Sequence, residues 1–226
     1  MCKNIIKSEL CEQLEHGLSN LGFSCVQQEQ KEQLLEFLTI LSKWNKVYNL
    51  TSVCDPRQML VRHVLDSLSL LNFLPGQSIL DVGTGPGLPG VPLSILSPSK
   101  DYVLMDCHQK KVNFVQYVVT SLGISNVVVK QARIEAYKPN DRFCAVVSRA
   151  FSSLGDFVKQ SRHACKDDGV MIAMRGQLGR SYPHHLPKGY KVTNVQHIQV
   201  PGLKAERCLV FVKKSYSYAN GIICGL

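Results

Sequence analysis

The feature of this sequence that most restricts its fold is the stretch ILDVGTGPGLPGVPLSIL, residues 79–96, which joins two apolar segments. Between residues 83 and 92 it contains four glycines and three prolines. Glycine has no Cβ and tolerates positive φ, so a ligand can approach the backbone of such a turn closely. Proline costs little in the first turn of a helix, where backbone amides have no acceptor within the helix. The stretch therefore predicts a strand, a tight ligand-facing turn and a helix whose first turn holds Pro89 and Pro92.

Short apolar segments alternate with helical ones after this turn. We expect strands at residues 78–82, 101–106, 126–131, 143–149 and 169–175, and a helix over residues 109–123. This alternation is typical of a parallel sheet with helices on both faces. Residues 190–200 and 208–214 are separated by one short connection, which predicts a terminal antiparallel hairpin. The predicted fold class is α/β, a mostly parallel seven-stranded sheet of the Rossmann-like class I methyltransferase type.

The residues before the sheet are expected to be helical. In residues 30–48 apolar side chains recur at three- and four-residue spacing, and residues 56–71 repeat this pattern after Pro56. The Pro-Gly-Gln sequence at 75–77 marks a boundary. We therefore expect an N-terminal helical layer over residues 1–74, a methyltransferase domain over residues 75–214 and a loose tail over residues 215–226.

Composition restricts the partners and the compartment. The chain has 26 Lys and Arg against 17 Asp and Glu, a net charge of +9, which is compatible with a polyanionic partner such as nucleic acid. The N-terminus lacks a signal-peptide pattern and charges interrupt the apolar runs, so we expect a cytoplasmic protein without membrane attachment. We also expect a monomer. The nine cysteines include no Cys-x-x-Cys pair, which argues against disulfides and a bound metal.

Two acidic residues near the glycine turn bear on the ligand. Gly85, Gly87 and Gly90 match the G-x-G-x-x-G pattern of dinucleotide sites. Asp81, however, ends the preceding strand, where its carboxylate would repel a pyrophosphate but suit the amino group of a methionine moiety. Asp106 ends the next strand and is expected to bind ribose hydroxyls in either site. The pattern favours S-adenosylmethionine. The alternatives are an NAD-dependent oxidoreductase and a ribosome-binding factor whose turn is only structural.

Motifs outside the glycine turn resemble one family. The segments WNKVYNLTSVCDPRQMLVRHVLDSL, ILDVGTGPGLPGVPLSI, VVSRAF and MRGQ occur in the order and spacing of the glucose-inhibited division protein B family. The resemblance implies an S-adenosylmethionine-dependent methyltransferase acting on N7 of a guanine in small-subunit (16S) ribosomal RNA or a 30S particle, with another RNA target as the alternative. The glycine turn and the next strand already indicate Gly85 and Asp106 as cofactor contacts. The resemblance adds Gly83, Leu88, Ile134, Glu135 and Arg149.

The chemistry of guanine N7 limits which catalytic groups are needed. N7 has a lone pair and no proton, so its methylation requires positioning but no general base, and we assign no catalytic residue. Arg149 is expected to hold the methionine carboxylate or to reach guanine O6. Candidates for the RNA side are Asn49, His63 and Arg133. Each also has a structural interpretation. Asn49 could cap or brace a turn, His63 could be a packed histidine, and Arg133 could form a structural salt bridge.

Other charged residues also have two interpretations. Lys110 and Lys111 suit RNA phosphates and equally a solvated helix surface. Arg62 and Asp66 are four residues apart, so we expect an exposed ion pair between them. Arg175 stands where the family more often has lysine, and MDCHQKK, residues 105–111, departs from the small and hydroxyl residues usual in the family.

Overall fold

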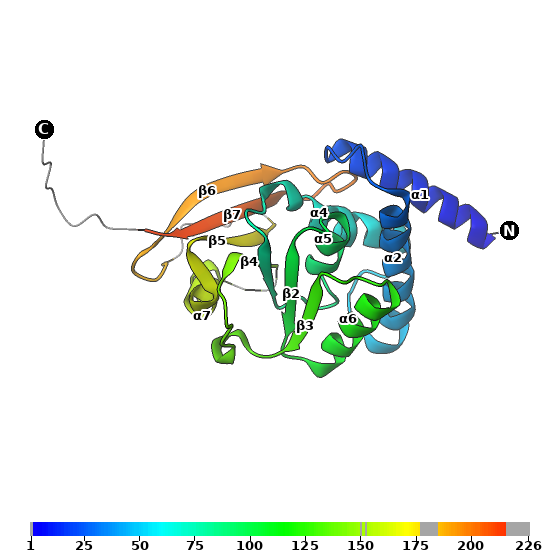
Figure 1. The fold of residues 1–226 in the computed structure, drawn as a ribbon. Coiled ribbons are helices and arrows are strands. Elements are labelled where there is room, and N and C mark those ends of the chain that lie inside the picture. The colour runs from blue at the N-terminus through cyan, green and yellow to red at the C-terminus, as the bar shows by residue number, and fades with distance from the viewer. Residues whose placement is uncertain (1, 150, 152, 177–184, 216–226) are drawn as a thin grey trace, which may run out of the picture.

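The protein, represented by a computed structural model, is described over residues 2–149, 151, 153–176 and 185–215 (Figure 1). These residues contain a seven-stranded sheet in the order β3-β2-β1-β4-β5-β7-β6. β1 to β5 are parallel to one another, whereas β7 is antiparallel to β5 and to β6. The strands are β1 (Ser78–Val82), β2 (Asp101–Asp106), β3 (Val127–Gln131), β4 (Phe143–Ser148), β5 (Cys165–Arg175), β6 (Tyr190–Ile198) and β7 (Arg207–Lys214). This topology confirms the predicted fold class.

Helices cover both faces of the sheet, because alternate strand residues point to opposite sides. Ile79 of β1 lies in the larger core, whereas its neighbour Leu80 lies in the smaller core with residues of α7. The larger core includes residues of α1 (Cys2–Asn20), α2 (Gln28–Tyr48), α5 (Gly90–Leu96) and α6 (Gln109–Ser121), together with residues of the helical segment 56–68. The smaller core contains α7 (Leu154–Ser161) and the 3-10 turns Ile134–Ala136 and Arg162–Ala164.

The N-terminal helices share one hydrophobic core with the sheet. Leu34, Leu38 and Leu41 of α2 are buried as their spacing predicts, but Tyr48 at the end of the same stripe is 39% exposed. The continuous helix expected over residues 56–71 is interrupted. α3 (Pro56–Met59) leads into a π-helical turn, Leu60–Leu65, followed by α4 (Asp66–Leu68) and the 3-10 turn Leu71–Phe73. Residues 216–226, nearly all of the predicted tail, lie outside the described residues.

Two expectations drawn from composition bear on the described residues. None of their helices has the length and apolar character needed to span a bilayer. Every cysteine whose surroundings are described is a free thiol.

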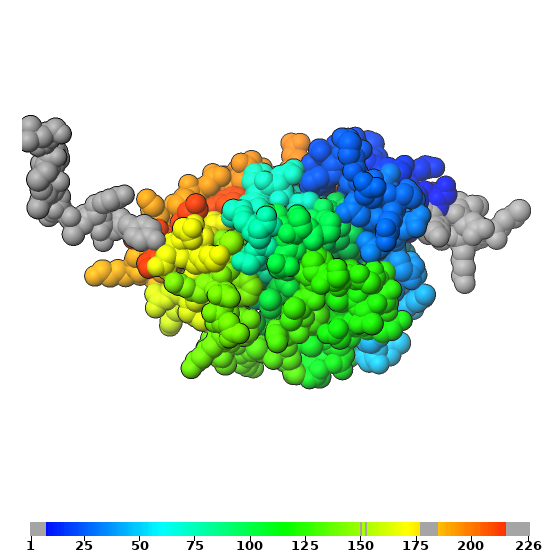
Figure 2. Space-filling model, in the orientation of Figure 1, coloured from blue at the N-terminus to red at the C-terminus, as the bar shows by residue number. Residues whose placement is uncertain are grey.

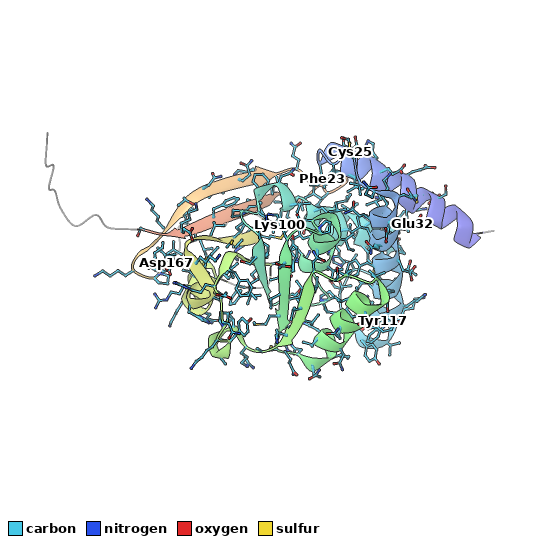
Figure 3. The ribbon with its side chains drawn as sticks, in the orientation of Figure 1. Phe23, Cys25, Glu32, Lys100, Tyr117 and Asp167 are labelled. Atoms are coloured by element: carbon cyan, nitrogen blue, oxygen red, sulfur yellow. The ribbon has the colours of Figure 1, made fainter. Side chains whose placement is uncertain are left out.

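The carboxyl edge of the parallel strands is where a ligand site is expected in such a sheet. Lys100, labelled in Figure 3, immediately precedes β2 and marks the opposite, amino edge. The glycine turn follows β1, and Asp106 ends β2, so both lie at the carboxyl edge.

Candidate functional site

The Asp81 carboxylate holds the glycine turn together from inside. Its Oδ2 accepts hydrogen bonds from Thr84 Oγ1 at 2.6 Å and from the Gly90 amide at 2.9 Å, and the residue is 0% exposed. Burial raises the pKa of Asp81 to about 6, although the bonds from Thr84 and Gly90 oppose this rise. The other oxygen, Oδ1, has no hydrogen-bond partner among the described residues, so contact of Asp81 with the amino group of a ligand stays a prediction. Through Oδ2 the carboxylate braces the turn.

The start of α5 has no amide available for a phosphate. The Gly90 amide donates to Asp81, the Val91 amide donates to the Gly87 carbonyl at 2.8 Å, and Pro92 has no amide hydrogen. Dinucleotide sites use these first amides of the helix to bind the pyrophosphate. The G-x-G-x-x-G match therefore lacks the donors on which that mode of binding depends.

Glycine is required at the positions of the turn for different physical reasons. A Cβ on Gly90 would lie 2.0 Å from Leu104 Cδ2, so close packing explains this glycine. One on Gly87 would lie 2.5 Å from Val91 Cγ2, and Gly87 also has φ of 82°, so packing and backbone conformation both require glycine there. A Cβ on Gly85 would meet no atom closer than 4.0 Å. Gly83 and Gly85 have φ of 71° and 58°, a conformation that favours glycine. Only these two residues remain as candidates for close approach to a ligand.

Asp106 is held as a carboxylate at the end of β2. Its Oδ2 accepts the Gly85 amide at 3.0 Å, and its Oδ1 lies 2.9 Å from both the amide and Nδ1 of His108. Burial acts to raise its pKa, but these hydrogen bonds and the charge of Lys111, 3.7 Å away, leave the pKa below its usual value. Asp106 is therefore an ionised acceptor at neutral pH.

A cavity of about 250 Å³ opens beside Asp106, and we call it the glycine-turn pocket. The predicted site residues that line it are Gly83, Asp106, Arg133, Ile134 and Glu135. The 3-10 turn after β3 buries Ile134 against the smaller core and leaves Glu135 exposed. Arg133, expected on the RNA side, thus belongs to this pocket.

Two predicted cofactor contacts, Leu88 and Gly85, do not line the glycine-turn pocket. The Leu88 side chain is 2% exposed in the larger core and lines neither this pocket nor the next one described. Gly85 is positioned by the hydrogen bond from its amide to Asp106.

A second cavity, of about 300 Å³, lies where β4, β5 and β7 meet the π-helical turn. We call it the arginine pocket, because four arginines line it together with His63 and Asp66: Arg62, Arg149, Arg175 and Arg207. Asp66 Oδ1 accepts a hydrogen bond from Arg207 Nε at 2.8 Å, and Oδ2 accepts one from Arg149 at 3.3 Å.

The expected exposed pair between Arg62 and Asp66 is therefore wrong. The Asp66 side chain is 2% exposed and pairs with two other arginines, whereas Arg62 is exposed. The π-helical turn between them changes the rotation that a regular α-helix would give over four residues. As a result, the backbone carbonyl of Arg62 accepts a bond from Arg149 at 3.3 Å.

His63 lines the arginine pocket as a neutral, buried ring. Its Nε2 lies 2.9 Å from Thr51 Oγ1, and its Nδ1 has no hydrogen-bond partner among the described residues. Burial, followed by the charge of Arg149, lowers its pKa to about 4. Asn49, the other RNA-side candidate, is an exposed left-handed cap that ends α2, with φ of 50°. The structural alternative fits Asn49, whereas His63 lies at a pocket.

Arg149 lies close to both the glycine turn and the arginine pocket. It follows β4, which pairs with β1, and it lines the arginine pocket rather than the glycine-turn pocket. Its charge lowers the pKa of both Asp81 and His63, so it is close to the base of the glycine turn as well as to the second cavity. The predicted cofactor contact thus sits between the turn and the arginine pocket.

Some residues of the site had little or no signal in the sequence. Arg207 lies 141 positions after Asp66, and no local pattern relates them. His108 was detectable, because an aspartate often bonds to the amide two residues later. The donor atoms of Asp106, Cys107 and His108 also lie within 4.8 Å of one another, a grouping able to hold a metal, so a metal-free site remains a prediction.

Comparisons with known proteins agree with this architecture. A family model described as rRNA small subunit methyltransferase G matches residues 30–210. Proteins named ribosomal RNA small subunit methyltransferase G from Shewanella pealeana and Vibrio atlanticus are 45% and 43% identical to the chain, over 91% and 92% of its length and 99% of theirs. A SAM-dependent methyltransferase structure from Aquifex aeolicus has a TM-score of 0.51 at 17% identity, covering 70% of this chain and 93% of that one, and supports the fold. The chain belongs to the rRNA small subunit methyltransferase G family.

Proposed function

We propose that this protein transfers a methyl group from S-adenosylmethionine to N7 of a guanine in small-subunit (16S) ribosomal RNA, in the cytoplasm and as a monomer. Membership of the family supports the reaction and the RNA class. The structural observation that supports it most is the presence of two cavities at one edge of the sheet, one beside an ionised Asp106 and one lined by arginines.

The residues of the glycine-turn pocket fit S-adenosylmethionine. The ionised Asp106 suits the ribose hydroxyls, and the buried Ile134 offers an apolar surface to the adenine. Gly83 lines the pocket without a Cβ, and Glu135 supplies a polar edge. Because the amides at the start of α5 are occupied, a ligand without a pyrophosphate fits better than a dinucleotide. When bound, S-adenosylmethionine supplies an electrophilic methyl group on a sulfonium.

The arginine pocket is assigned to the target guanine and its backbone. Four arginines favour the approach of a polyanion and can bind phosphate oxygens or guanine O6. The fixed pair of Arg149 with Asp66 keeps one guanidinium oriented between the pocket and the glycine turn. Because His63 stays neutral at pH 7, it adds no further positive charge next to a purine that becomes cationic when N7 is methylated.

No proton transfer is required of these residues. Guanine N7 attacks with its lone pair, so the work of the site is to orient the base and exclude competing nucleophiles. Positioning of this kind can lower a barrier by about 7 to 11 kcal/mol.

Transfer of tritium from labelled S-adenosylmethionine tests the function. Small subunits from cells that lack the activity are incubated with the protein, and the RNA is digested to nucleosides. We expect label in N7-methylguanosine from the 16S RNA, and much less label with Asp106→Ala at a low concentration of the donor. Label in another nucleoside, in another RNA or in protein would contradict the assignment. Calorimetry with NADH and S-adenosylhomocysteine separates the oxidoreductase alternative, because only the second should bind.

A further inference from the structure

A cluster of aromatic side chains lies outside both pockets, on the surface where α2 meets α6. Trp44 is the centre of the cluster, with ring centroids 5.1 Å from Tyr48 and 5.3 Å from Tyr117. Lys110 Nζ lies 5.0 Å from the centroid of the Tyr48 ring. We call these four residues the aromatic platform. Figure 3 shows Tyr117 at the edge of the molecule, on α6.

One side of the aromatic platform packs against the core, and its two tyrosines are exposed to solvent. Trp44 packs against the fully buried Phe114 ring, with centroids 5.3 Å apart at 65°. Tyr48 and Tyr117 are 39% and 49% exposed, and the neighbouring Val47 is 70% exposed. Large rings exposed together in one patch mark a binding surface more often than isolated exposed side chains do. Figure 2 shows that α2 (blue) and α6 (green) adjoin at the surface.

The charge around the platform selects the kind of partner. Residues 37–54 and 107–134, which contain the C-terminal part of α2 and the whole of α6, include no aspartate or glutamate. The same two ranges contain six basic residues, Lys43, Lys46, Lys110, Lys111, Lys130 and Arg133. An aromatic surface beside these lysines suits single-stranded nucleic acid, in which bases stack on rings while phosphates meet cations.

The platform adjoins both pockets along the chain. Tyr48 is followed by Thr51, whose hydroxyl contacts His63 of the arginine pocket, while Asn45 bonds to the Thr51 amide at 2.8 Å and fixes that connection. On α6, Lys110 is followed by Lys111, which lines the glycine-turn pocket. A strand of RNA whose target base enters the arginine pocket therefore has this surface close to its neighbouring nucleotides.

We propose that the aromatic platform stacks an unpaired base of the RNA strand that carries the methylated guanine. This inference rests on the proposed function for the identity of the RNA, but stacking itself is measured by binding. The platform would act as a positioning surface and not as part of the reacting site. It would favour substrates in which the target guanine lies in a single-stranded segment.

The single tryptophan of the chain makes the platform directly observable. Trp44 is the only tryptophan, so its fluorescence reports on this surface alone. We expect quenching when an unlabelled single-stranded 16S RNA fragment is added, with a midpoint equal to that of fluorescence anisotropy of the same fragment carrying a dye. Unchanged emission at saturating RNA would overturn the proposal.

Paired variants separate stacking from charge. The change of Tyr48 and Tyr117 together to alanine should raise the Kd for RNA by about 5-fold or more, whereas their change to phenylalanine keeps the rings and should alter it less than about 2-fold. Lys110→Ala should weaken binding, whereas Lys204→Ala, which removes an equal charge between β6 and β7, should not. The S-adenosylhomocysteine Kd should stay unchanged in all four variants.

Kinetics with assembled small subunits complete the test. The double alanine variant should show a raised KM for the particle with kcat close to that of the unchanged protein. An unchanged KM and RNA affinity in this variant would refute the platform while leaving the methyl transfer intact. Conversely, if the unchanged protein binds RNA with Trp44 quenching but transfers no methyl group to it, the proposed function fails and the platform stands.

Discussion

The buried carboxylate of Asp66 gives a sharp test of how the arginine pocket is held. Asp66 accepts hydrogen bonds from Arg207 at 2.8 Å and Arg149 at 3.3 Å, and its side chain is 2% exposed. The change Asp66→Asn keeps the size of the side chain but removes the charge and one acceptor. Two guanidinium groups are then left facing an amide, and at most one of them keeps a bonded oxygen.

The expected loss follows from these contacts. A hydrogen bond between charged groups contributes about 1.5 to 3 kcal/mol to stability, and breaking a buried ion pair costs about 3 to 5 kcal/mol. Because Arg149 and Arg207 are 27% and 26% exposed, water replaces part of the lost interaction. We expect Asp66→Asn to lower the free energy of unfolding by about 2 to 3 kcal/mol, which corresponds to a fall in Tm of about 5 to 10 °C for a chain of this length.

A matched control comes from the surface. Asp167 also bridges two cations, Arg142 at 2.7 Å and Lys214 at 3.1 Å, but its side chain is 46% exposed. Asp167→Asn should therefore cost less than about 1 kcal/mol. Thermal unfolding followed by circular dichroism, with urea titration at 25 °C, measures both variants. Equal effects of the two changes, or no change in Tm for Asp66→Asn, would refute the structural role given to Asp66.

Three further predictions concern the other parts of the site. Asp106→Ala should weaken S-adenosylhomocysteine binding by about 10-fold or more in calorimetry, and undiminished affinity would remove Asp106 from the cofactor site. Because the pKa of His63 falls from 6.5 to about 4 on folding, its contribution of about 3 kcal/mol is present above pH 6.5 and is lost as pH falls toward 4. Asp81, whose pKa is raised, acts in the opposite direction in both proteins. Because His63→Gln removes the titrating ring, urea titrations should show a smaller loss of unfolding free energy between pH 6.5 and pH 4 in this variant than in the unchanged protein. Gly90→Ala should cost about 1 to 3 kcal/mol, because its Cβ would lie 2.0 Å from Leu104 Cδ2, and an unchanged urea midpoint would contradict that packing.

The sheet was predictable because its signals are local. Apolar runs of five or six residues bounded by turn residues indicate buried parallel strands, and the positions of β1, β2 and β4 follow such runs closely. Pro92 lies in the first turn of α5 as predicted, whereas Pro89, predicted in the same turn, precedes it as the N-cap. The family motifs indicate further cofactor residues. Of these, Ile134 and Glu135, which follow β3, line one pocket together with Gly83 and Asp106.

The errors arise where tertiary contacts override local patterns. The bracing of the glycine turn by Asp81, whose carboxylate bonds Thr84 and the helix start, was not predicted. The spacing of Arg62 and Asp66 assumes a regular helix, but a π-helical turn separates them and Asp66 finds Arg207 from a distant strand. No single-sequence pattern encodes such pairings, because they depend on which strand ends meet in the folded sheet.

We infer that the glycine-turn pocket holds the methyl donor and that the arginine pocket receives the base. A crystal structure with S-adenosylhomocysteine bound tests it most directly. We expect the ribose hydroxyls on the Asp106 carboxylate, the adenine against Ile134, and the sulfur toward Arg149. A ligand seated among the arginines instead, or Asp106 without contact to the ribose, would contradict the assignment.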